Sequence, residues 1–526
     1  MAVYWPRDRN MWMPTTPAHW TAERLRASAR ARFGDQSIVV VANREPFRHE
    51  RSADGSVVVR RSTGGLVAAL EPVVQACDGV WVAHGGGDAD RAVVDSRSRV
   101  QSPCDAGGYW LRRVWLNRRE TQGYYDGFAN EGLWPLCHRV HVQPVFRSHD
   151  FSMYRSVNQR FADAVTNELE TEAPIVLVQD YHLALLPGLI KSRSRRSTVV
   201  TFWHVPFPGP RDFAICPWGR LLLEGLLGST IVGFQTPSDC RNFVETVDSQ
   251  IPGVIHDGET IVHAAGRTLV RAYPASIEWP NRWARQSPPV DVCRRTIREH
   301  CHLHLDARLA VGVDRLDYTK GIREKFLAVE RLLEMHPDLR DRFAFVQIAE
   351  PSRACLPAYR EASSRIRSVA DRVNSRFGRA GVGPIILLER RHEPADLMRY
   401  FRAADACYVG SLHDGMNLVA KEFVGARDDE RGALVLSQFA GAARELTAAL
   451  LTNPYAIDDC ADTLARALSM PAAEQAWRMR DLRAVVSASN TYAWAGRMLA
   501  DAAHLRSDEW GTFHEPDGQS LGSLHA

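Results

Sequence analysis

The sequence predicts an α/β protein in which two parallel-sheet domains face a central cleft. Short runs of branched apolar residues alternate with segments whose apolar residues recur at helical spacing, which is typical of βα units. Two such series are separated by YPASIEWP (273–280), whose prolines and tryptophan indicate a connection between domains. The chain has 526 residues, which is too many for one ordinary core.

The composition is that of a globular enzyme. Hydrophobic residues make up 45% of the chain and charged residues 24%, which argues against a disordered, fibrous or membrane-embedded protein. The formal net charge is only +3, far below the basic excess that is typical of nucleic-acid-binding proteins. No signal-peptide pattern or long apolar run occurs, and the 10 cysteines never form CxxC. We therefore expect a cytoplasmic protein with reduced thiols, no membrane anchor and no nucleic-acid partner.

Residues 1–36 are predicted to form an N-terminal extension. Within it, WTAERLRASARARF (20–33) has the pattern of a basic amphipathic helix. We expect a solvated arm. A contact with a second copy of the chain, or a lid, is the alternative.

Residues 37–275 are predicted to form the first domain. SIVVVANREPF (37–47) is a buried strand with its following loop, and a hairpin is expected at 50–61. STGGLVAALEPVVQAC (62–77) then places two glycines before a helix. Further strands are expected at 79–84, 174–179, 197–204 and 229–235.

Residues 276–485 are predicted to form the second domain. Strands are expected at 309–314, 343–349, 383–389, 406–411 and 433–438, followed by helical segments from about 461 to 505. Residues 486–507 are expected to form a terminal helix, and 508–526 a polar tail. Ligands of such folds bind outside the carboxyl ends of the strands, so we expect the site between the two domains.

The most informative stretches follow strands of the second domain. In VDRLDYTKG (313–321), Arg315 and Lys320 could neutralise a diphosphate; the alternative is a surface pair of cations. In SLHDGMNLVAKEF (411–423), a helix start could bind phosphate or sugar hydroxyls, and Glu422 a ribose diol. Its alternative is a capped helix with a solvated Lys–Glu pair. Because both stretches occupy corresponding strand ends, together they favour a binding site.

The first domain offers weaker signals. HVPFPGP (204–210) places His204 after an apolar strand, and QDYHL (179–183) places Asp180 and His182 after another. Such histidines are more often structural than catalytic. YYDGFANEGLWP (124–135) could wall a sugar site or belong to the core. DAD (88–90) has no neighbouring ligand, so no metal is expected. Metalloprotease and P-loop motifs are absent.

Several motifs resemble one family, the trehalose-6-phosphate synthases, which are retaining glycosyltransferases with two Rossmann-like domains in the GT-B arrangement. The resemblance covers about residues 37–500 in collinear order. It is carried by NR (43–44), TGGL (63–66), YYxxFxNxxLWP (124–135), DYHL (180–183), HxPFP (204–208), RLDYxKG (315–321), DGMNLVAKE (414–422) and SQFAGAARELTAALLTNPY (437–455).

The resemblance implies a role for each matching residue. The catalytic set would be His204, Arg315, Lys320 and Asp414. Arg315 and Lys320 would hold the donor diphosphate, Glu422 the ribose, and the backbone of Gly65 would approach the donor phosphates. The transferred glucose would be held by His204, Asp414 and the backbone of Gly415, Met416, Asn417 and Leu418. Glucose 6-phosphate would be bound by Arg44, Tyr125, Trp134, Asp180 and Arg353, the two arginines clamping its phosphate.

The implied reaction is retaining transfer of glucose from a nucleotide-glucose, with UDP-glucose as the leading donor, to glucose 6-phosphate, giving trehalose 6-phosphate. No metal or other cofactor is implied, and no carboxylate pair is placed as in a glycosidase. A separate phosphatase would be a pathway partner, and a homo-oligomer is left open. The alternatives are another acceptor, as in glucosylglycerol-phosphate synthases, or a catalytically silent relative.

Four positions depart from the family pattern. Gln179 replaces the first histidine of HDYHL, and His84 replaces the second tryptophan of WxGW. His413 replaces the arginine before DGMN, and Ala275 with Ser276 replaces a glycine near the interdomain isoleucine. Because His84 and Gln179 fall near the acceptor side, they leave the acceptor open. The sequence also leaves open whether the nucleotide of the donor is UDP, GDP or ADP.

Overall fold

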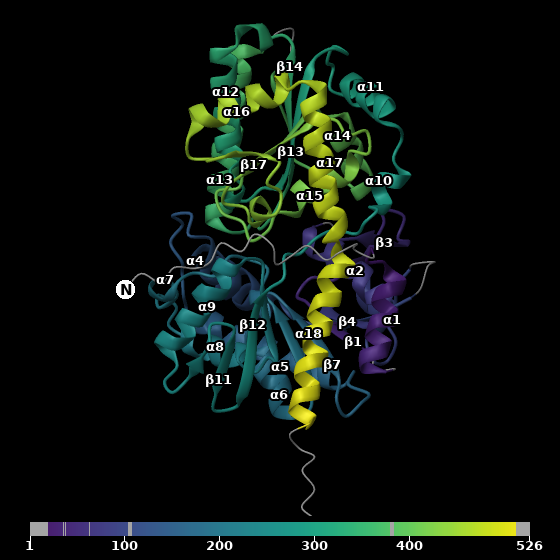
Figure 1. Cartoon of the computed structure of the whole chain (residues 1–526), viewed down its shortest axis with the longest axis vertical. Helices are drawn as coiled ribbons and strands as arrows, with labels where there is room; N and C mark the ends of the chain where they lie inside the picture. The colour runs from purple at the N-terminus through teal and green to yellow at the C-terminus, as the bar shows by residue number, and fades with distance from the viewer. Residues whose placement is uncertain are drawn as a thin grey trace, which may run out of the picture.

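A computed structural model describes residues 19–34, 36, 38–62, 64–103, 108–378 and 383–511. The first 18 residues of the extension, Cys104 and residues 512–526 of the predicted tail lie outside these ranges. The chain forms two lobes stacked along its long axis, each built on one large sheet (Figure 1).

The first lobe contains a ten-stranded sheet in the order β10-β11-β12-β9-β8-β7-β1-β4-β6-β5. Its central strands from β12 to β6 are all parallel, and antiparallel strands lie at both edges. The strands are β1 (Ile38–Val41), β4 (Val80–His84), β5 (Arg99–Gln101), β6 (Trp110–Val114), β7 (Ile175–Gln179), β8 (Thr198–Phe202), β9 (Ile231–Phe234), β10 (Ile255–His256), β11 (Thr260–His263) and β12 (Gly266–Ala272).

The second lobe contains a six-stranded, wholly parallel sheet in the order β15-β14-β13-β16-β17-β18. Its strands are β13 (Arg308–Arg315), β14 (Phe343–Glu350), β15 (Ile385–Leu388), β16 (Ala406–Val409), β17 (Ala433–Ser437) and β18 (Leu450–Thr452). All the strands predicted in both lobes are confirmed. The sequence missed β5, β6, β10, β11, β12 and β18.

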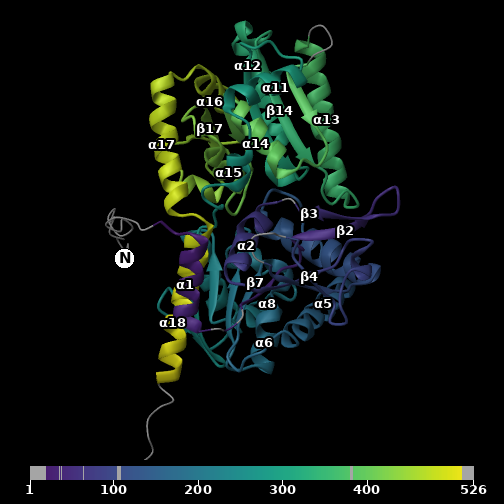
Figure 2. The ribbon, with the colours of Figure 1, turned by 90° about the vertical axis from the view of Figure 1, so that its right-hand side faces the viewer.

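The predicted hairpin is present as β2 (Phe47–Arg51) and β3 (Val57–Arg61), starting three residues earlier than expected. It lies beside the junction of the two lobes (Figure 2). Its position brings Arg48 of β2 toward the cleft, where this side chain lines a cavity described below.

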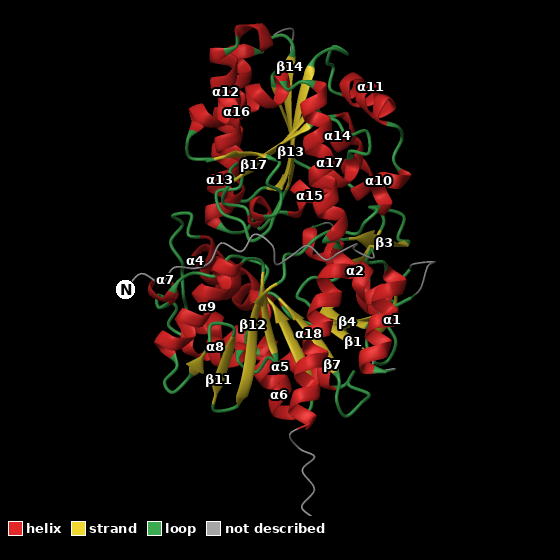
Figure 3. Cartoon of the chain, in the orientation of Figure 1, coloured by secondary structure: helices red, strands yellow, loops and turns green. Residues whose placement is uncertain are grey.

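Helices cover both faces of both sheets (Figure 3). Those of the first lobe are α2 (Gly65–Ala76), α3 (Arg118–Thr121), α4 (Trp134–His138), α5 (Ser148–Thr166), α6 (Leu186–Arg193), α7 (Pro210–Phe213), α8 (Gly219–Leu226), α9 (Pro237–Gln250) and a π-helix (Gln122–Leu133). Those of the second are α10 (Arg282–Gln286), α11 (Val290–His300), α12 (Ile322–Met335), α13 (Pro357–Phe377), α14 (Pro394–Ala403), α15 (Leu418–Ala426), α16 (Ile457–Ser469) and α17 (Ala472–Ala488).

The last helix, α18 (Thr491–Gly511), returns to the first lobe and packs beside α1 (Ala22–Phe33), α2 and β8 (Figures 1 and 2). The start of α18 is held by two hydrogen bonds: the Thr491 amide donates to the Ile277 carbonyl (2.9 Å), and its hydroxyl donates to the Ala69 carbonyl (2.6 Å). The chain therefore crosses between the lobes twice, near residues 275 and 490.

The prediction of a solvated N-terminal arm is wrong for α1. Its residues Leu25, Ala29 and Phe33 are buried in the same core as α18 and α2. The Arg26 side chain donates to the Ala76 carbonyl (2.8 Å) at the C-terminus of α2. The many basic residues of this amphipathic helix favoured a solvated arm, but its apolar stripe of three residues is sufficient for one-sided packing.

Helix α18 supports the first sheet through Trp494, which is 1% exposed and packs edge-on against Phe202 with ring centroids 5.1 Å apart. Trp494→Ala should lower the free energy of unfolding by about 3–5 kcal/mol, because a large buried ring is replaced by a cavity. Denaturant titration measures this loss. The matched control is Trp477→Ala, since Trp477 is 49% exposed; losses of equal size in both variants would contradict the packing argument.

Candidate active site

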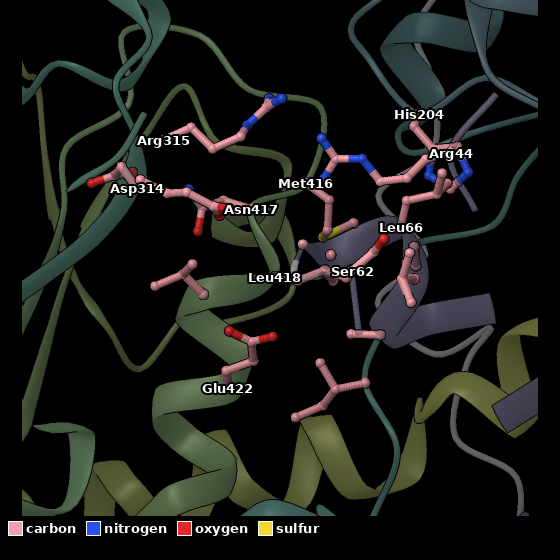
Figure 4. A pocket seen from close by; sticks show the side chains of 18 of the residues that line it. Arg44, Ser62, Leu66, His204, Asp314, Arg315, Met416, Asn417, Leu418 and Glu422 are labelled. Atoms are coloured by element: carbon pink, nitrogen blue, oxygen red, sulfur yellow. The ribbon is translucent and has the colours of Figure 1, made fainter. Parts of the chain in front are cut away.

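A cavity of about 360 Å³ lies between the carboxyl ends of the two sheets. In Figure 4 side chains of α15 approach it from one side, and Arg44, His204 and Leu66 of the first lobe from the other. Of the predicted site residues, all except Gly415 line this cavity. They are Arg44, Gly65, Tyr125, Trp134, Asp180, His204, Arg315, Lys320, Arg353, Asp414, Met416, Asn417, Leu418 and Glu422.

The two cations of the RLDYxKG motif stand at the end of β13. Arg315 is the last residue of this strand, and Lys320 ends the short turn that follows it. The Lys320 Nζ lies 2.5 Å from Oδ2 of Asp414. Although burial by itself opposes it, the Lys320 ammonium lowers the pKa of Asp414 to about 2. Asp414 is therefore ionised at neutral pH.

The loop before α15 is fixed by its own side chains. Asn417 has a φ of 72° and caps α15, and its amide donates to Ser411 Oγ (3.2 Å) and Asp414 Oδ2 (3.1 Å). The Ser411 hydroxyl also donates to Asp414 (3.0 Å). This geometry places the backbone N–H groups at the start of α15 beside the cavity, an arrangement suited to anionic or hydroxyl ligands.

Gly415 lies against the other lobe instead of lining the cavity. A Cβ at this position would stand 2.0 Å from the carbonyl oxygen of His204, which no side chain could tolerate. Gly65, the first residue of α2, faces the same loop from the first lobe, since its Cβ would lie 3.1 Å from Leu418. The two glycine motifs thus allow the lobes to approach.

Glu422 lies on the first turns of α15 and points into the cavity (Figure 4). Burial raises the pKa of Glu422 to about 7, well above its ordinary value. Near neutral pH the side chain can therefore accept hydrogen bonds from a diol and, when protonated, donate one as well.

His204 follows β8 and is held by two residues at the end of β7. Its backbone amide donates to Asp180 Oδ1 (3.1 Å), and its ring Nε2 lies 2.8 Å from the side-chain oxygen of Gln179. Burial lowers the pKa of His204 to about 3, so the ring is neutral. With Nε2–H donated to Gln179, the other ring nitrogen is a hydrogen-bond acceptor.

Arg353 reaches from the second lobe into the first. Its guanidinium lies 4.3 Å from the centre of the Trp134 ring and donates to the Tyr181 hydroxyl (3.3 Å) and to Tyr359. Asp317, which is fully buried, accompanies it at 3.7 Å. Both tyrosine bonds and the aromatic stacking hold the planar guanidinium in one orientation.

The remaining acceptor residues lie opposite Arg353. Tyr125 stacks on His182 with ring centroids 5.6 Å apart. Although burial opposes it, the positive charges of Arg353 and Arg44 lower the pKa of Tyr125. Burial raises the pKa of Asp180 to about 6. This half of the cavity combines two arginines, ring faces and one carboxyl group, which suits a phosphorylated sugar.

Among the cavity residues that sequence reasoning did not assign to the site, three lie inside or beside its own motifs. His138 lies four residues after Trp134 and donates from Nδ1 to the Trp134 carbonyl (2.9 Å), which leaves Nε2 as an acceptor. Asn43 accepts from the Tyr124 hydroxyl (3.1 Å). Tyr181 lines the cavity beside Arg353. Their position inside or beside the motifs is the sequence feature that could have identified them.

The four departures from the family pattern have definite contacts. Gln179 orients His204, as described above. His413 donates to the backbone carbonyl of His138 (2.7 Å) and so links the lobes. The Ala275 amide donates to Gln235 (2.9 Å), and its carbonyl accepts from Lys421 Nζ (2.7 Å). His84 lines a second, adjacent cavity.

The DAD segment serves a structural purpose. Asp90 is fully buried, lies 2.6 Å from Nη1 of Arg113, and accepts from the amides of His49 and Gly87 (2.7 Å each). The Arg51 amide donates to Asp88 (2.9 Å). Within the described ranges no cluster of three or more His, Cys, Asp or Glu side chains could hold a metal ion.

Two further observations concern the described part of the chain as a whole. Its cysteines are all free thiols. None of its helices combines the length and the apolar character that crossing a membrane requires.

Residues 36–504 match the family model for glycosyltransferase family 20. The chain belongs to this family. Among the relatives of this family 20 glycosyltransferase, a trehalose-6-phosphate synthase of Mycobacterium sp. (strain KMS) is 38% identical over 492 residues, covering 90% of this chain and 96% of the relative.

Solved structures support the predicted fold class. The trehalose 6-phosphate synthase of Burkholderia multivorans superposes with a TM-score of 0.79 at 31% identity, covering 92% of this glycosyltransferase and 100% of that chain. The Burkholderia xenovorans enzyme in complex with glucose-6-phosphate has a TM-score of 0.77 at 32% identity and covers 88% and 99%. The prediction of two parallel-sheet domains in the GT-B arrangement is confirmed.

Glu422 gives the ligand-free enzyme a pH-dependent stability. Its pKa rises on folding from 4.5 to about 7, so the folded chain binds this proton more tightly than the unfolded chain. The resulting destabilisation grows as the pH rises from about 4.5 and is complete above about 7. Glu422→Gln should therefore raise the free energy of unfolding by up to about 3 kcal/mol at pH 8 and by less than about 1 kcal/mol at pH 5.

Denaturant titrations at the two pH values measure this difference. Glu172→Gln is the control, because the Glu172 side chain is 84% exposed. A stabilisation of Glu422→Gln that is the same at both pH values would contradict the burial argument.

Proposed function

We propose that this glycosyltransferase moves glucose from UDP-glucose to glucose 6-phosphate with retention of configuration, giving α,α-trehalose 6-phosphate. The observation that carries the proposal is that Arg315 and Lys320, suited to a diphosphate, line the same cavity as Arg44 and Arg353, suited to a sugar phosphate. The names of the relatives support it, as does a similar structure from E. coli, bound with UDP-2-fluoro glucose, with a TM-score of 0.77 at 30% identity.

In this proposal residues 37–275 form the acceptor domain and residues 276–485 the donor domain. Arg315 and Lys320 bind the donor diphosphate, and Glu422 binds the ribose. His204, Asp414 and the backbone from Gly415 to Leu418 orient the glucose, while Gly65 approaches the phosphates. Lys320 exchanges its contact with Asp414 for one with the diphosphate, which frees the Asp414 carboxylate for sugar hydroxyls.

The chemical step breaks the bond between glucose C1 and the diphosphate oxygen. The acceptor hydroxyl forms the new bond to C1 on the same face, and its proton passes to the departing phosphate oxygen. The protein contributes orientation and charge: Arg315 and Lys320 stabilise the negative charge that develops on the leaving group. Asp414 stays held by Ser411 and Asn417 when Lys320 turns to the diphosphate, and it acts by hydrogen bonding.

On the acceptor side, Arg44 and Arg353 clamp the phosphate, while Tyr125, Trp134 and Asp180 bind the sugar. Because Arg44 and Arg353 belong to different lobes, a phosphate between them favours the closed cleft. Closure excludes water from the nucleotide sugar and protects it from hydrolysis.

The proposal includes no resident metal or cofactor, cytoplasmic activity on small molecules only, and a separate phosphatase that consumes the product. The second candidate keeps the donor half and changes the acceptor to glycerol 3-phosphate. It is favoured by His84 and Gln179, the two departures near the acceptor side.

The leaving-group role predicts the effect of two substitutions. Arg315→Ala and Lys320→Ala should each lower kcat/KM by at least about 10²-fold, because each removes charge that stabilises the departing diphosphate. The rate of nucleotide release from UDP-glucose measures kcat/KM. Arg323→Ala is the control, since the Arg323 side chain is 48% exposed. Turnover near that of the wild type in both active-site variants would remove the donor assignment.

The phosphate clamp predicts which acceptors are used. Unphosphorylated glucose should be a very poor acceptor. Arg353→Ala should lower kcat/KM for glucose 6-phosphate by at least about 10²-fold, while its Kd for UDP should stay within about threefold of the wild-type value. Steady-state kinetics with glucose, glucose 6-phosphate and glycerol 3-phosphate at saturating donor decide this.

Arg353→Lys, which keeps the charge without the planar fork, and Arg360→Ala on the exposed surface of α13 are the matched variants. Equal efficiency of the wild type with glucose and glucose 6-phosphate would remove the clamp. Exclusive use of glycerol 3-phosphate would keep the clamp and replace the leading candidate by the second.

A further inference from the structure

A second cavity, of about 260 Å³, opens beside the active-site cavity on its acceptor side. Arg44 and Ser62, labelled in Figure 4, line both cavities and mark the side on which the second one lies. Asn43, Tyr125 and Glu350 are also shared. The residues that line only the second cavity are Glu45, Arg48, His84, Gly86 and Arg391. The proposed reaction gives none of these five a role.

Both lobes contribute cations to this cavity. Arg44 and Arg48 come from the first lobe, and Arg391 from the loop after β15 in the second. Arg353, the other half of the acceptor clamp, lines only the first cavity. The second cavity therefore has its own guanidinium groups in addition to the one it shares.

The side chain of Arg391 indicates which class of ligand suits the second cavity. Its Nε and Nη2 atoms are buried and make no hydrogen bond within the described part of the chain. The Glu393 carboxylate is 3.9 Å from Nη2, too far for a hydrogen bond. Leaving charged N–H groups buried without an acceptor is costly, and an anion in the cavity would supply that acceptor.

The acidic residues of the cavity do not cancel this charge. Glu45 accepts from the Gly86 amide (3.0 Å) and lies 3.3 Å from the buried Arg113. Burial and the neighbouring Asp90 raise the pKa of Glu45 to about 8, so its carboxyl is mostly protonated at neutral pH. The other acidic residue of the walls is Glu350, and three arginines face it: Arg44, Arg48 and Arg391. Glu50 pairs with Arg48 (2.6 Å) from outside the cavity.

The cavity also has neutral donors and room. Burial lowers the pKa of His84, so its neutral ring offers one N–H. The Asn43 oxygen is occupied by Tyr124, which leaves the amide N–H groups for a ligand. The cavity volume of about 260 Å³ is several times the roughly 30 Å³ that one water molecule occupies. A phosphate with a small organic group therefore fits in it.

We propose that the second cavity binds a phosphate dianion in addition to the phosphate of the acceptor, with Arg391 of one lobe and Arg48 of the other as its ligands. The dianion is either inorganic phosphate or the phosphomonoester of a second small molecule. Because it joins both lobes, it stabilises the closed cleft, so the site can regulate the enzyme or widen its acceptor range.

Isothermal titration calorimetry of the full chain with inorganic phosphate tests the proposal. Saturating UDP and glucose 6-phosphate are present so that the donor and acceptor sites are filled. The wild type should bind one phosphate under these conditions. Arg391→Gln should weaken this binding by at least about 10-fold, because charge-assisted hydrogen bonds are lost. Arg390→Gln is the matched control, since Arg390 is exposed and lines neither cavity.

A second variant removes space instead of charge. His84→Trp places a larger ring in the cavity and should also weaken phosphate binding by at least about 10-fold, and thermal melting checks that both variants fold. Repeating the titration with methyl phosphate distinguishes the two sources: tighter binding of methyl phosphate indicates a phosphomonoester, and tighter binding of the ion indicates inorganic phosphate.

Absence of phosphate binding once glucose 6-phosphate is bound would overturn the proposal, because the acceptor phosphate would then occupy the second cavity. Equal affinity in the wild type, Arg391→Gln and His84→Trp would overturn it too, as would an equal loss in Arg390→Gln. If glucose 6-phosphate itself does not bind, phosphate binding that depends on Arg391 still supports the second site, and only the proposed acceptor fails.

Discussion

The active-site cavity depends on how closely the two lobes approach at Gly415. A side chain there would collide with the backbone carbonyl of His204, so the loop before α15 can reach the end of β8 only as glycine. This approach brings Asp414 and Asn417, which follow a strand of the second lobe, close to His204, which follows a strand of the first lobe. The bond from His413 to the His138 carbonyl and the contact of Arg353 with Tyr181 reinforce the same junction. Each lobe alone presents half of a site.

Concentrating cations at this junction requires buried counter-ions. Asp414 pairs with Lys320, and Asp317 lies 3.7 Å from Arg353 and 4.0 Å from Arg315. Without them the cleft would hold several uncompensated charges in a desolvated space. Both carboxylates sit within hydrogen-bonded turns, so they stay in place when a substrate takes over the cations. The site is thereby organised before the substrate arrives, which is what electrostatic catalysis needs.

Two of the four departures from the family pattern, Gln179 and His84, lie on the side of the cleft formed by the first lobe. Gln179 orients His204 from the end of β7, and His84 lines the arginine-rich second cavity. The loop that carries His84 and Gly86 is held by Glu45, Asp90 and Arg113, a buried charged group on three separate segments.

The sequence by itself determined the α/β class, the two-lobe division and most of the site, because buried parallel strands are continuous apolar runs and the motifs stand at their ends. It could not determine β6 (WLRRV) or β12 (GRTLVRA), since their charged residues disguise the strand pattern: Arg113 is buried only because it pairs with Asp90, which is distant in sequence. Nor could it place α1 against α18, or bring His138, Tyr181 and Arg391 to the cleft. Such contacts join residues far apart along the chain, so only the tertiary structure decided them.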